Sequence, residues 1–125
     1  MNTIILGCWV ATGLINPELI KAIIRVESNN GAQIYHYNPN GSHDLGYMQI
    51  NSNTVPGLNG YKLLTDKCYN IRTGVELLKD LQRRMYNRPL WYSAYHTGVS
   101  GFYKHIERRH NYINKLRDAG YYEQK

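Results

Sequence analysis

The fold is decided by a stretch near the N-terminus, Asn16-Pro17-Glu18-Leu19-Ile20-Lys21-Ala22-Ile23-Ile24-Arg25-Val26-Glu27-Ser28. Its first residues favour a helix start, because Asn can cap the first turn, Pro fits the geometry of that turn and Glu suits the positive end of the dipole. The apolar residues then recur at steps of three and four, and Glu27 continues the same face. The sequence therefore predicts a helix that ends near Ser28 with a carboxyl group on its buried side.

Glu27 is expected to hold a proton near neutral pH. Apolar surroundings and the negative end of the helix dipole both disfavour the charged carboxylate, so both raise its pKa. A carboxylic acid in that state suits general acid catalysis. The alternative is a glutamate that turns toward solvent or pairs with Arg25 or Lys21.

A second stretch, Ser42-His43-Asp44-Leu45-Gly46-Tyr47-Met48-Gln49-Ile50-Asn51-Ser52, places another carboxylate seventeen residues after the first. Residues 34–37 and 44–48 are expected to form the strands of a small irregular hairpin around a turn at 38–41. The polar residues of this hairpin could line a cleft or could be ordinary turn residues. They are Asn38, Asn40, Ser42, Asp44, Gln49 and Asn51.

The other segments with clear periodicity are expected to be helical. Short helices are expected at 8–13, with Trp9, and at 90–96, and longer amphipathic helices at about 66–86 and 102–119. The last of these should bury Phe102, Ile106, Ile113 and Leu116. We therefore predict a mainly α fold of the α+β class, with a single domain over residues 1–125 and a small β-hairpin.

Composition limits the classes of partner. The net charge is +6, and most of the lysines and arginines follow residue 65, so an anionic wall polymer, nucleic acid or anionic lipid would be attracted. A solvated basic face that aids solubility is the alternative. No run of apolar residues is long enough for a membrane span.

Cys8 and Cys68 are the two cysteines. They could form a disulfide, which would need an oxidising compartment, or remain two buried thiols. No cysteine or histidine spacing suggests a metal site, and no cofactor-binding motif is present, so neither a metal nor a cofactor is expected. The first residues do not form an intact signal peptide, so either the chain is cytoplasmic or a signal has been removed.

The pair of Glu27 and Asp44 fits the chemistry of glycoside cleavage. That chemistry needs a protonated acid at the leaving oxygen and a group that stabilises the oxocarbenium-like sugar. Glu27 is the expected acid and Asp44 the expected stabilising group.

Three short motifs resemble the signatures of soluble lytic transglycosylase (SLT) domains, in the same order and at comparable spacing. They are Val26-Glu27-Ser28-Asn29, Gly46-Tyr47-Met48-Gln49-Ile50-Asn51 and Ala94-Tyr95-His96-Thr97-Gly98, and the resemblance covers about residues 8–119. Cys8-Trp9 and Cys68-Tyr69-Asn70-Ile71 are similar to the EtgA- or IagB-like subgroup attached to type III secretion and conjugation systems. That subgroup implies a periplasmic location and a Cys8–Cys68 disulfide.

The resemblance also implies roles for individual residues. Glu27 would act as acid and then as base, Met48 and Gln49 would line the sugar sites, and Tyr95 would steady the reacting centre. His96 stands where the family usually has Asn. The substrate-binding residues expected in all are Ser28, Met48, Gln49, Asn51, Tyr95 and His96.

Residues 42–52 also resemble the Asp-bearing segment of c-type lysozymes, and the interval from Glu27 to Asp44 matches as well. The expectation is therefore a lysozyme-like domain that cuts the β-1,4 bond between N-acetylmuramic acid and N-acetylglucosamine. Attack by the muramyl 6-hydroxyl would give a 1,6-anhydro product, whereas attack by water would be lysozyme-type hydrolysis; the family favours the first route and Asp44 supports the second.

The expected partners are peptidoglycan glycan strands and a periplasmic component of a type III or conjugative secretion apparatus. The chain is expected to be a monomer in the periplasm with its signal peptide removed, with no nucleic-acid partner and no membrane span. A peptidoglycan-binding module without catalysis and a basic helical domain that binds nucleic acid are the rival interpretations.

Overall fold

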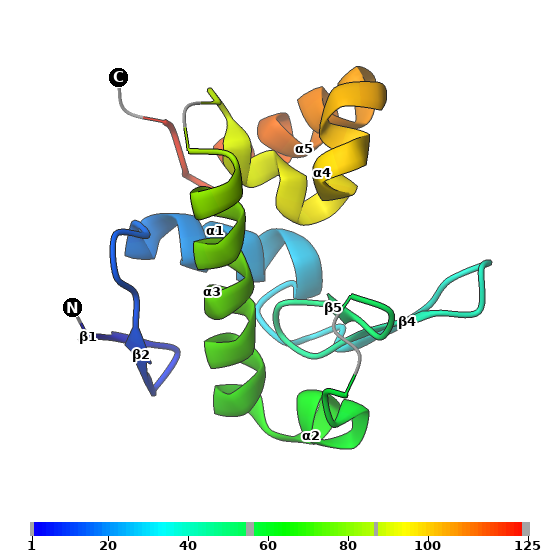
Figure 1. The fold of residues 1–125 in the computed structure, drawn as a ribbon. Coiled ribbons are helices and arrows are strands. Elements are labelled where there is room, and N and C mark those ends of the chain that lie inside the picture. The colour runs from blue at the N-terminus through cyan, green and yellow to red at the C-terminus, as the bar shows by residue number, and fades with distance from the viewer. Residues whose placement is uncertain (1, 55–56, 87, 124–125) are drawn as a thin grey trace.

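The computed structural model describes residues 2–54, 57–86 and 88–123. Helices dominate it, and two small antiparallel sheets complete it, which confirms the predicted α+β lysozyme-like class (Figure 1). The elements in chain order are β1 (Asn2–Ile5), β2 (Cys8–Ala11), α1 (Pro17–Ser28), β3 (Tyr35–Tyr37), β4 (His43–Leu45), β5 (Ile50–Asn51), α2 (Gly60–Thr65), α3 (Lys67–Arg84), the 3-10 helix η1 (Trp91–Ser93), α4 (Ala94–Lys104) and α5 (Ile106–Asp118). None of the described helices is long and apolar enough to cross a membrane.

Helices α1 and α3 form the centre of the core, and α1 crosses behind α3 in Figure 1. Asn16 caps α1 as predicted, because its side chain accepts a hydrogen bond from the backbone N–H of Glu18. The helix ends where Asn29 adopts a left-handed conformation with φ 51°. The apolar stripes of both helices are buried, so burial of these faces is the main source of the fold's stability.

The N-terminal segment differs from the prediction of a helix at 8–13. Residues Cys8–Ala11 instead form β2, which pairs antiparallel with β1 so that Ile5 lies opposite Cys8 and Ile4 opposite Trp9. The side chains alternate between buried and exposed, with Ile5, Cys8 and Val10 facing the core. The period of two along both strands, and not the helical period, therefore decides the conformation.

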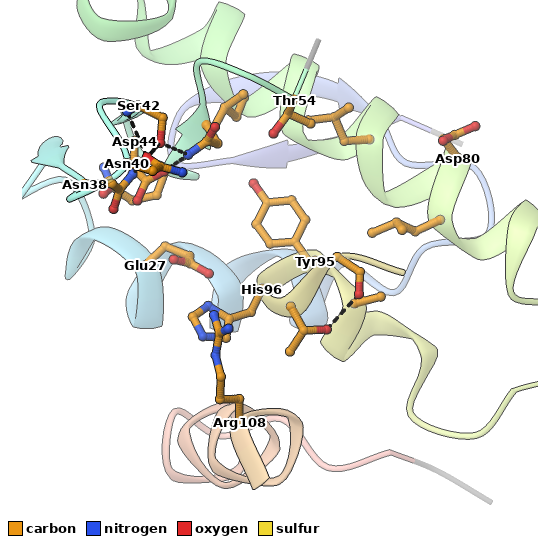
Figure 2. Close-up of a pocket in the computed structure, with 18 of the residues that line it drawn as sticks. Glu27, Asn38, Asn40, Ser42, Asp44, Thr54, Asp80, Tyr95, His96 and Arg108 are labelled. Carbon is orange, nitrogen blue, oxygen red and sulfur yellow. Dashed lines mark hydrogen bonds between the residues drawn. The ribbon is translucent and has the colours of Figure 1, made fainter. Parts of the chain in front are cut away.

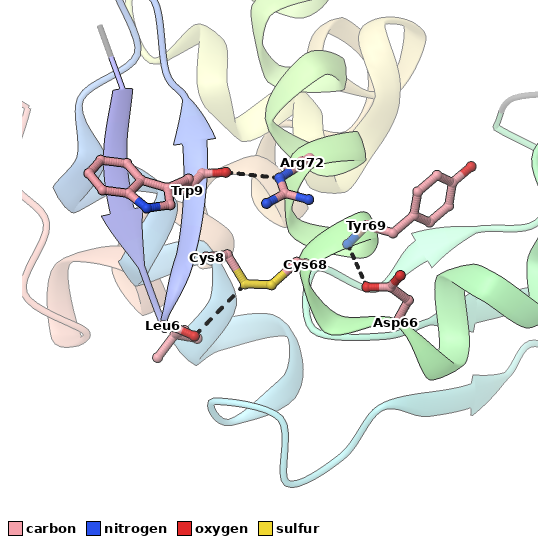
Figure 3. The surroundings of a disulfide bond; sticks show 7 residues. All are labelled: Leu6, Cys8, Trp9, Asp66, Cys68, Tyr69 and Arg72. Atoms are coloured by element: carbon pink, nitrogen blue, oxygen red, sulfur yellow. Dashed lines mark hydrogen bonds between the residues drawn. A yellow bond between two sulfur atoms is a disulfide. The ribbon is translucent and has the colours of Figure 1, made fainter.

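The predicted disulfide between Cys8 and Cys68 is present (Figure 3). It joins β2 to the first turn of α3 across 60 residues of chain, with 5.4 Å between the two Cα atoms. One turn further along α3, Nε of Arg72 donates a hydrogen bond to the carbonyl of Trp9 at 2.8 Å. Both links hold the β1–β2 hairpin against α3.

The second sheet has the order β3-β4-β5 and contains the predicted hairpin. The return strand is shorter than predicted, because Gly46 takes φ 78° and turns the chain after Leu45. Asn70 of α3 fixes this turn: its side chain accepts from the N–H of Met48 and donates to the carbonyls of Leu45 and Leu63. A Cβ atom at Gly46 would overlap the Asn70 amide, so the close approach requires glycine.

The C-terminal helices lie close to their predicted places but have other boundaries. The helix expected at 90–96 is the 3-10 helix η1 followed by α4, which runs on to Lys104 through a kink at Gly98. The last helix begins at Ile106 instead of residue 102. Phe102, Ile113 and Leu116 are buried as predicted, whereas Ile106 is 58% exposed because it begins the new helix beyond the core.

Candidate active site

A cavity of about 580 Å³ lies between the second sheet and the helices (Figure 2). The end of α1, the β4–β5 region, the C-terminal half of α3, α4 and the start of α5 all contribute to its wall. Six of the predicted site residues line it: Glu27, Asp44, Gln49, Asn51, Tyr95 and His96. Its volume is in the range of ligand sites in proteins.

Glu27 is only partly buried as a residue, but its carboxyl group is enclosed by protein. Burial raises the pKa of this carboxyl to about 7, and the negative charge of Asp44 adds to the rise. A hydrogen bond from the Tyr112 hydroxyl to Oε2, 2.8 Å long, and the charge of Lys115 act in the opposite direction. The pKa of Glu27 thus lies close to neutral pH, in the direction that the buried stripe of α1 predicted.

Asp44 faces Glu27 from the other wall of the cavity in Figure 2. Nδ2 of Asn51 donates to Oδ1 of Asp44 at 2.9 Å and to Oγ of Ser42 at 3.0 Å. Ser42 in turn donates to Oδ1 of Asn40 and accepts from Nδ2 of Asn38. These polar hairpin residues therefore form one hydrogen-bonded network that holds the Asp44 carboxylate in place.

Tyr95 stands beside the gap between the two carboxyl groups. Its hydroxyl donates to the backbone carbonyl of Met48, which ties α4 to the turn after β4. Burial raises the pKa of Tyr95 well above its ordinary value, and the nearby Glu27 and Asp44 charges add to this. The phenol therefore stays neutral and keeps its hydrogen bond at physiological pH.

Ser28 and Met48, two of the expected substrate-binding residues, lie beneath the cavity wall and are not among the residues that line it. The Met48 side chain is 0% exposed and packs against Gly74 of α3. Ser28 is equally buried; its hydroxyl donates to the Ile24 carbonyl and accepts from the N–H of Gly31. Both residues shape the backbone that carries Glu27 and Gln49.

Gln49 lines the cavity from a left-handed backbone conformation with φ 50°. Its side-chain Nε2 donates to the carbonyl of Gly46 at 2.9 Å. This hydrogen bond stabilises the tight turn and fixes the orientation of the Gln49 amide. A non-glycine residue in this region of backbone space is strained, and such strain is common at functional sites.

His96 lies on the opposite side of the cavity from the sheet. Its ring is stacked on that of Tyr112, with the centroids 4.7 Å apart and the planes 5° from parallel. Burial lowers the pKa of His96, and the charges of Arg108 and Lys115 lower it further. The imidazole is therefore neutral at pH 7. An Asn side chain, which the family usually has at this position, would be neutral as well.

The sequence did not reveal two residues of the site, Tyr112 and Arg108. Tyr112 is fully enclosed, and its hydroxyl binds Glu27, 85 residues away in the sequence. A signal was present, because Tyr112 lies four residues before Leu116 on the apolar face of α5 and a buried tyrosine hydroxyl needs a partner. Arg108 gave no such signal, because it lies among other basic residues of the last helix.

Glu27 and Asp44 line one cavity of a lysozyme-like fold. A pair of carboxyl groups of this kind is typical of proteins that cleave glycosidic bonds. Residues 9–117 match the family described as Transglycosylase SLT domain, and the chain belongs to that family. It is accordingly a peptidoglycan-cleaving enzyme of the lytic transglycosylase type, and its substrate lies outside the cytoplasm.

The curated relatives that match the chain share one name. The chain is 31% identical over 124 residues to the protein named Invasion protein IagB of Salmonella typhimurium strains SL1344 and LT2, with 93% of this chain and 76% of the relative covered. The protein of the same name from Salmonella typhi has the same identity and coverage. No solved structure matched the chain.

Proposed function

We propose that the chain cuts the β-1,4 bond between N-acetylmuramic acid and N-acetylglucosamine and releases 1,6-anhydro-muramyl ends. The observation that carries this proposal is Glu27, whose buried carboxyl has a pKa of about 7 and faces Asp44 across a cavity large enough for sugar residues. The family match supports the transglycosylase outcome over hydrolysis.

In the first step Glu27 gives its proton to the glycosidic oxygen. Oε2 accepts the Tyr112 hydrogen bond, so the acidic proton belongs on Oε1. The bond between the muramyl anomeric carbon and that oxygen breaks, and the departing N-acetylglucosamine keeps the proton as its 4-hydroxyl. A pKa near the working pH gives the group both a bound proton and the tendency to release it.

In the second step the ionised Glu27 acts as a base. The muramyl 6-hydroxyl oxygen bonds to the anomeric carbon, and its proton passes to the Glu27 carboxylate, which restores the starting acid. Between the two steps the sugar is positively charged, and the fixed negative charge of Asp44 stabilises it. Asn51 keeps this carboxylate in place through its 2.9 Å hydrogen bond.

The other cavity residues position the glycan. Gln49, Asn51 and the neutral His96 offer hydrogen-bonding groups to the N-acetyl and hydroxyl groups of the sugars, and the Tyr95 ring offers an apolar edge. Ser28 and Met48 act indirectly, because they are buried and hold the backbone of the catalytic helix and turn.

Hydrolysis by water is the second candidate, and the Asp44 network favours it. A carboxylate paired with an acidic glutamate is the arrangement of lysozyme, where the second carboxylate stabilises or attacks the sugar. In that outcome the product carries a reducing end instead of a 1,6-anhydro ring.

We also place the enzyme in the periplasm, where it opens the wall locally for an envelope-spanning secretion machine. The relatives are named invasion proteins, and the Cys8–Cys68 disulfide suits an oxidising compartment. A strain that lacks the protein should then grow with a normal wall but export less protein through the machine.

The deciding experiment is mass spectrometry of sacculi digested with the purified protein. Muropeptides with anhydro ends are expected from the wild type, and none from Glu27→Gln, which keeps the volume and the Tyr112 hydrogen bond but has no proton to transfer. Reducing ends would assign hydrolysis. The absence of both products from a folded wild-type protein would exclude catalysis and leave a wall-binding module.

A further inference from the structure

Among the described residues, one cation that lines the cavity has no ion-pair partner. Arg108, in the first turn of α5, lines the cavity with Glu27 and His96. Figure 2 shows its side chain rising from α5 toward the His96 ring, and its charge helps to lower the pKa of that ring after the larger effect of burial. Within the described part of the chain, no carboxylate lies at ion-pair distance from Arg108.

The neighbouring arginines have partners within the protein. Arg109 donates to the carbonyl of Phe102 at 2.9 Å, and its guanidinium lies 4.4 Å from the centre of the Phe102 ring. Arg84, which also lines the cavity, pairs with Asp80 at 3.1 Å. These side chains have structural roles, whereas the exposed Arg108 side chain has no such partner in the described part of the chain and can bind a ligand that enters the cavity.

The carboxyl groups around the cavity do not neutralise this charge. The Glu27 carboxyl, with a pKa of about 7, accepts a hydrogen bond from Tyr112, Asp44 is held in the hairpin network, and Asp80 is shared by two arginines. Lys115, on the same helix as Arg108, adds a second positive charge that acts on Glu27 and His96. The α5 side of the cavity is therefore positive and the sheet side negative.

The substrate carries the missing anion. In peptidoglycan each muramyl residue bears a lactyl ether, which ends either in its own carboxylate or in a short peptide with free carboxylates. A planar guanidinium binds a carboxylate through two parallel hydrogen bonds, with more geometric selectivity than an ammonium group. We propose that Arg108 binds a carboxylate of this lactyl or peptide branch and so selects muramyl-containing glycan over neutral N-acetylglucosamine polymers.

This assignment rests on the proposed function, and it is tested by binding so that turnover does not interfere. The parent protein carries Glu27→Gln, and the ligands are peptide-bearing glycan fragments, the same fragments after amidase has removed the peptides, and a neutral N-acetylglucosamine oligomer. Adding Arg108→Ala should weaken binding of the muramyl fragments whose carboxylate Arg108 contacts about ten-fold, as expected for a lost charge-assisted hydrogen bond, and should leave the neutral oligomer unchanged.

The amidase-treated fragments distinguish the two possible anions. An effect confined to the amidase-treated fragments assigns the lactyl carboxylate, which is free only there, and an effect confined to the peptide-bearing fragments assigns a peptide carboxylate. Weakening of both shows that Arg108 binds whichever carboxylate the branch presents. Arg108→Lys should retain part of the affinity, and raising the salt concentration should weaken binding in the parent more than in Arg108→Ala. Arg117→Ala, an exposed arginine of the same helix outside the cavity, should change nothing.

Two results would overturn the assignment: an Arg108→Ala effect of the same size on the neutral oligomer, or no effect on any ligand. If wild-type protein still cleaves sacculi in either case, only the role of Arg108 is wrong. If the wild type neither cleaves sacculi nor binds any of the three ligands with Arg108 intact, the proposed function fails together with it.

Discussion

The two small sheets of this protein are stabilised by different means and do different things. The β1–β2 hairpin buries apolar side chains and is joined to α3 by a disulfide, and none of its described residues lines the cavity. The β3–β5 sheet is held by side-chain hydrogen bonds among polar residues and carries Asp44 and Asn51 into the cavity. Covalent closure and apolar burial thus serve stability, while the polar network serves chemistry.

Removing the disulfide should produce the largest change in stability. In the double variant Cys8→Ser/Cys68→Ser, the unfolded chain regains the entropy of a 60-residue loop, so the free energy of unfolding should fall by roughly 4 kcal/mol. Denaturant titration measures this loss. Under conditions where the variant is still folded, its kcat on sacculi should match the wild type, and a parallel loss of kcat would show that the first hairpin also shapes the site.

The pH dependence of stability should arise from the second region. Glu27 has a pKa of about 7 in the fold and about 4.5 when unfolded, so between these values the folded state binds more protons. Stability is therefore highest below pH 4.5 on account of this group and falls by roughly 3 kcal/mol as the pH rises past 7. Glu27→Gln should remove this pH dependence. Denaturant titration of the wild type and the variant at each pH measures it, because the difference between their free energies of unfolding excludes the contribution of other groups.

Asp44→Asn should reduce activity far more than stability. Loss of a fixed charge that stabilises the oxocarbenium-like sugar should lower kcat by on the order of 100-fold, while the free energy of unfolding changes by less than about 1 kcal/mol. Because the Asp44 charge raises the pKa of Glu27, the alkaline limb of the pH–rate profile should also move to lower pH. Asp118→Asn, at the exposed end of α5, is the matched control and should change neither quantity.

Trp9→Ala should have the smallest effect. Trp9 lies on the outer face of the first hairpin opposite Ile4 and is 62% exposed. Its removal therefore loses only a cross-strand contact, and the free energy of unfolding should fall by less than about 1 kcal/mol with no change in kcat. A larger loss of activity than of stability would contradict the separation of the two regions.

The sequence predicted the features that are local in the chain. The capped helix, the buried position of Glu27 and the hairpin around Asp44 each follow from a spacing or turn signal within a few residues. The prediction of a helix at 8–13 was wrong because four residues fit both the helical period and the strand period. The pairing of Cys8 with Ile5 across a tight turn decided for the strand. The burial of Ser28 and Met48 was not predicted, since a motif identifies a residue's place in the chain but not its burial.

The parts of the site that remained hidden depend on contacts across long stretches of chain. The bond from Tyr112 to Glu27 and the stacking of Tyr112 on His96 exist only once α5 packs beside α1 and α4. The network that links Asn38 through Ser42 to Asp44 is local in the chain, but each of its residues alone reads as an ordinary turn former, so the hydrogen bonds among them were not predicted. The buried position of Glu27 was predictable from its own helix, whereas its hydrogen bond with Tyr112 was not.

Asn70 has a consequence for how such an enzyme is made. Its side chain holds the backbone on both sides of Gly46 from the buried face of α3, so the turn that carries the site takes its final shape only after that helix is in place. A chain that is still folding accordingly has no assembled cavity. Catalytic activity is therefore expected to appear only in chains in which α3 has packed against this turn.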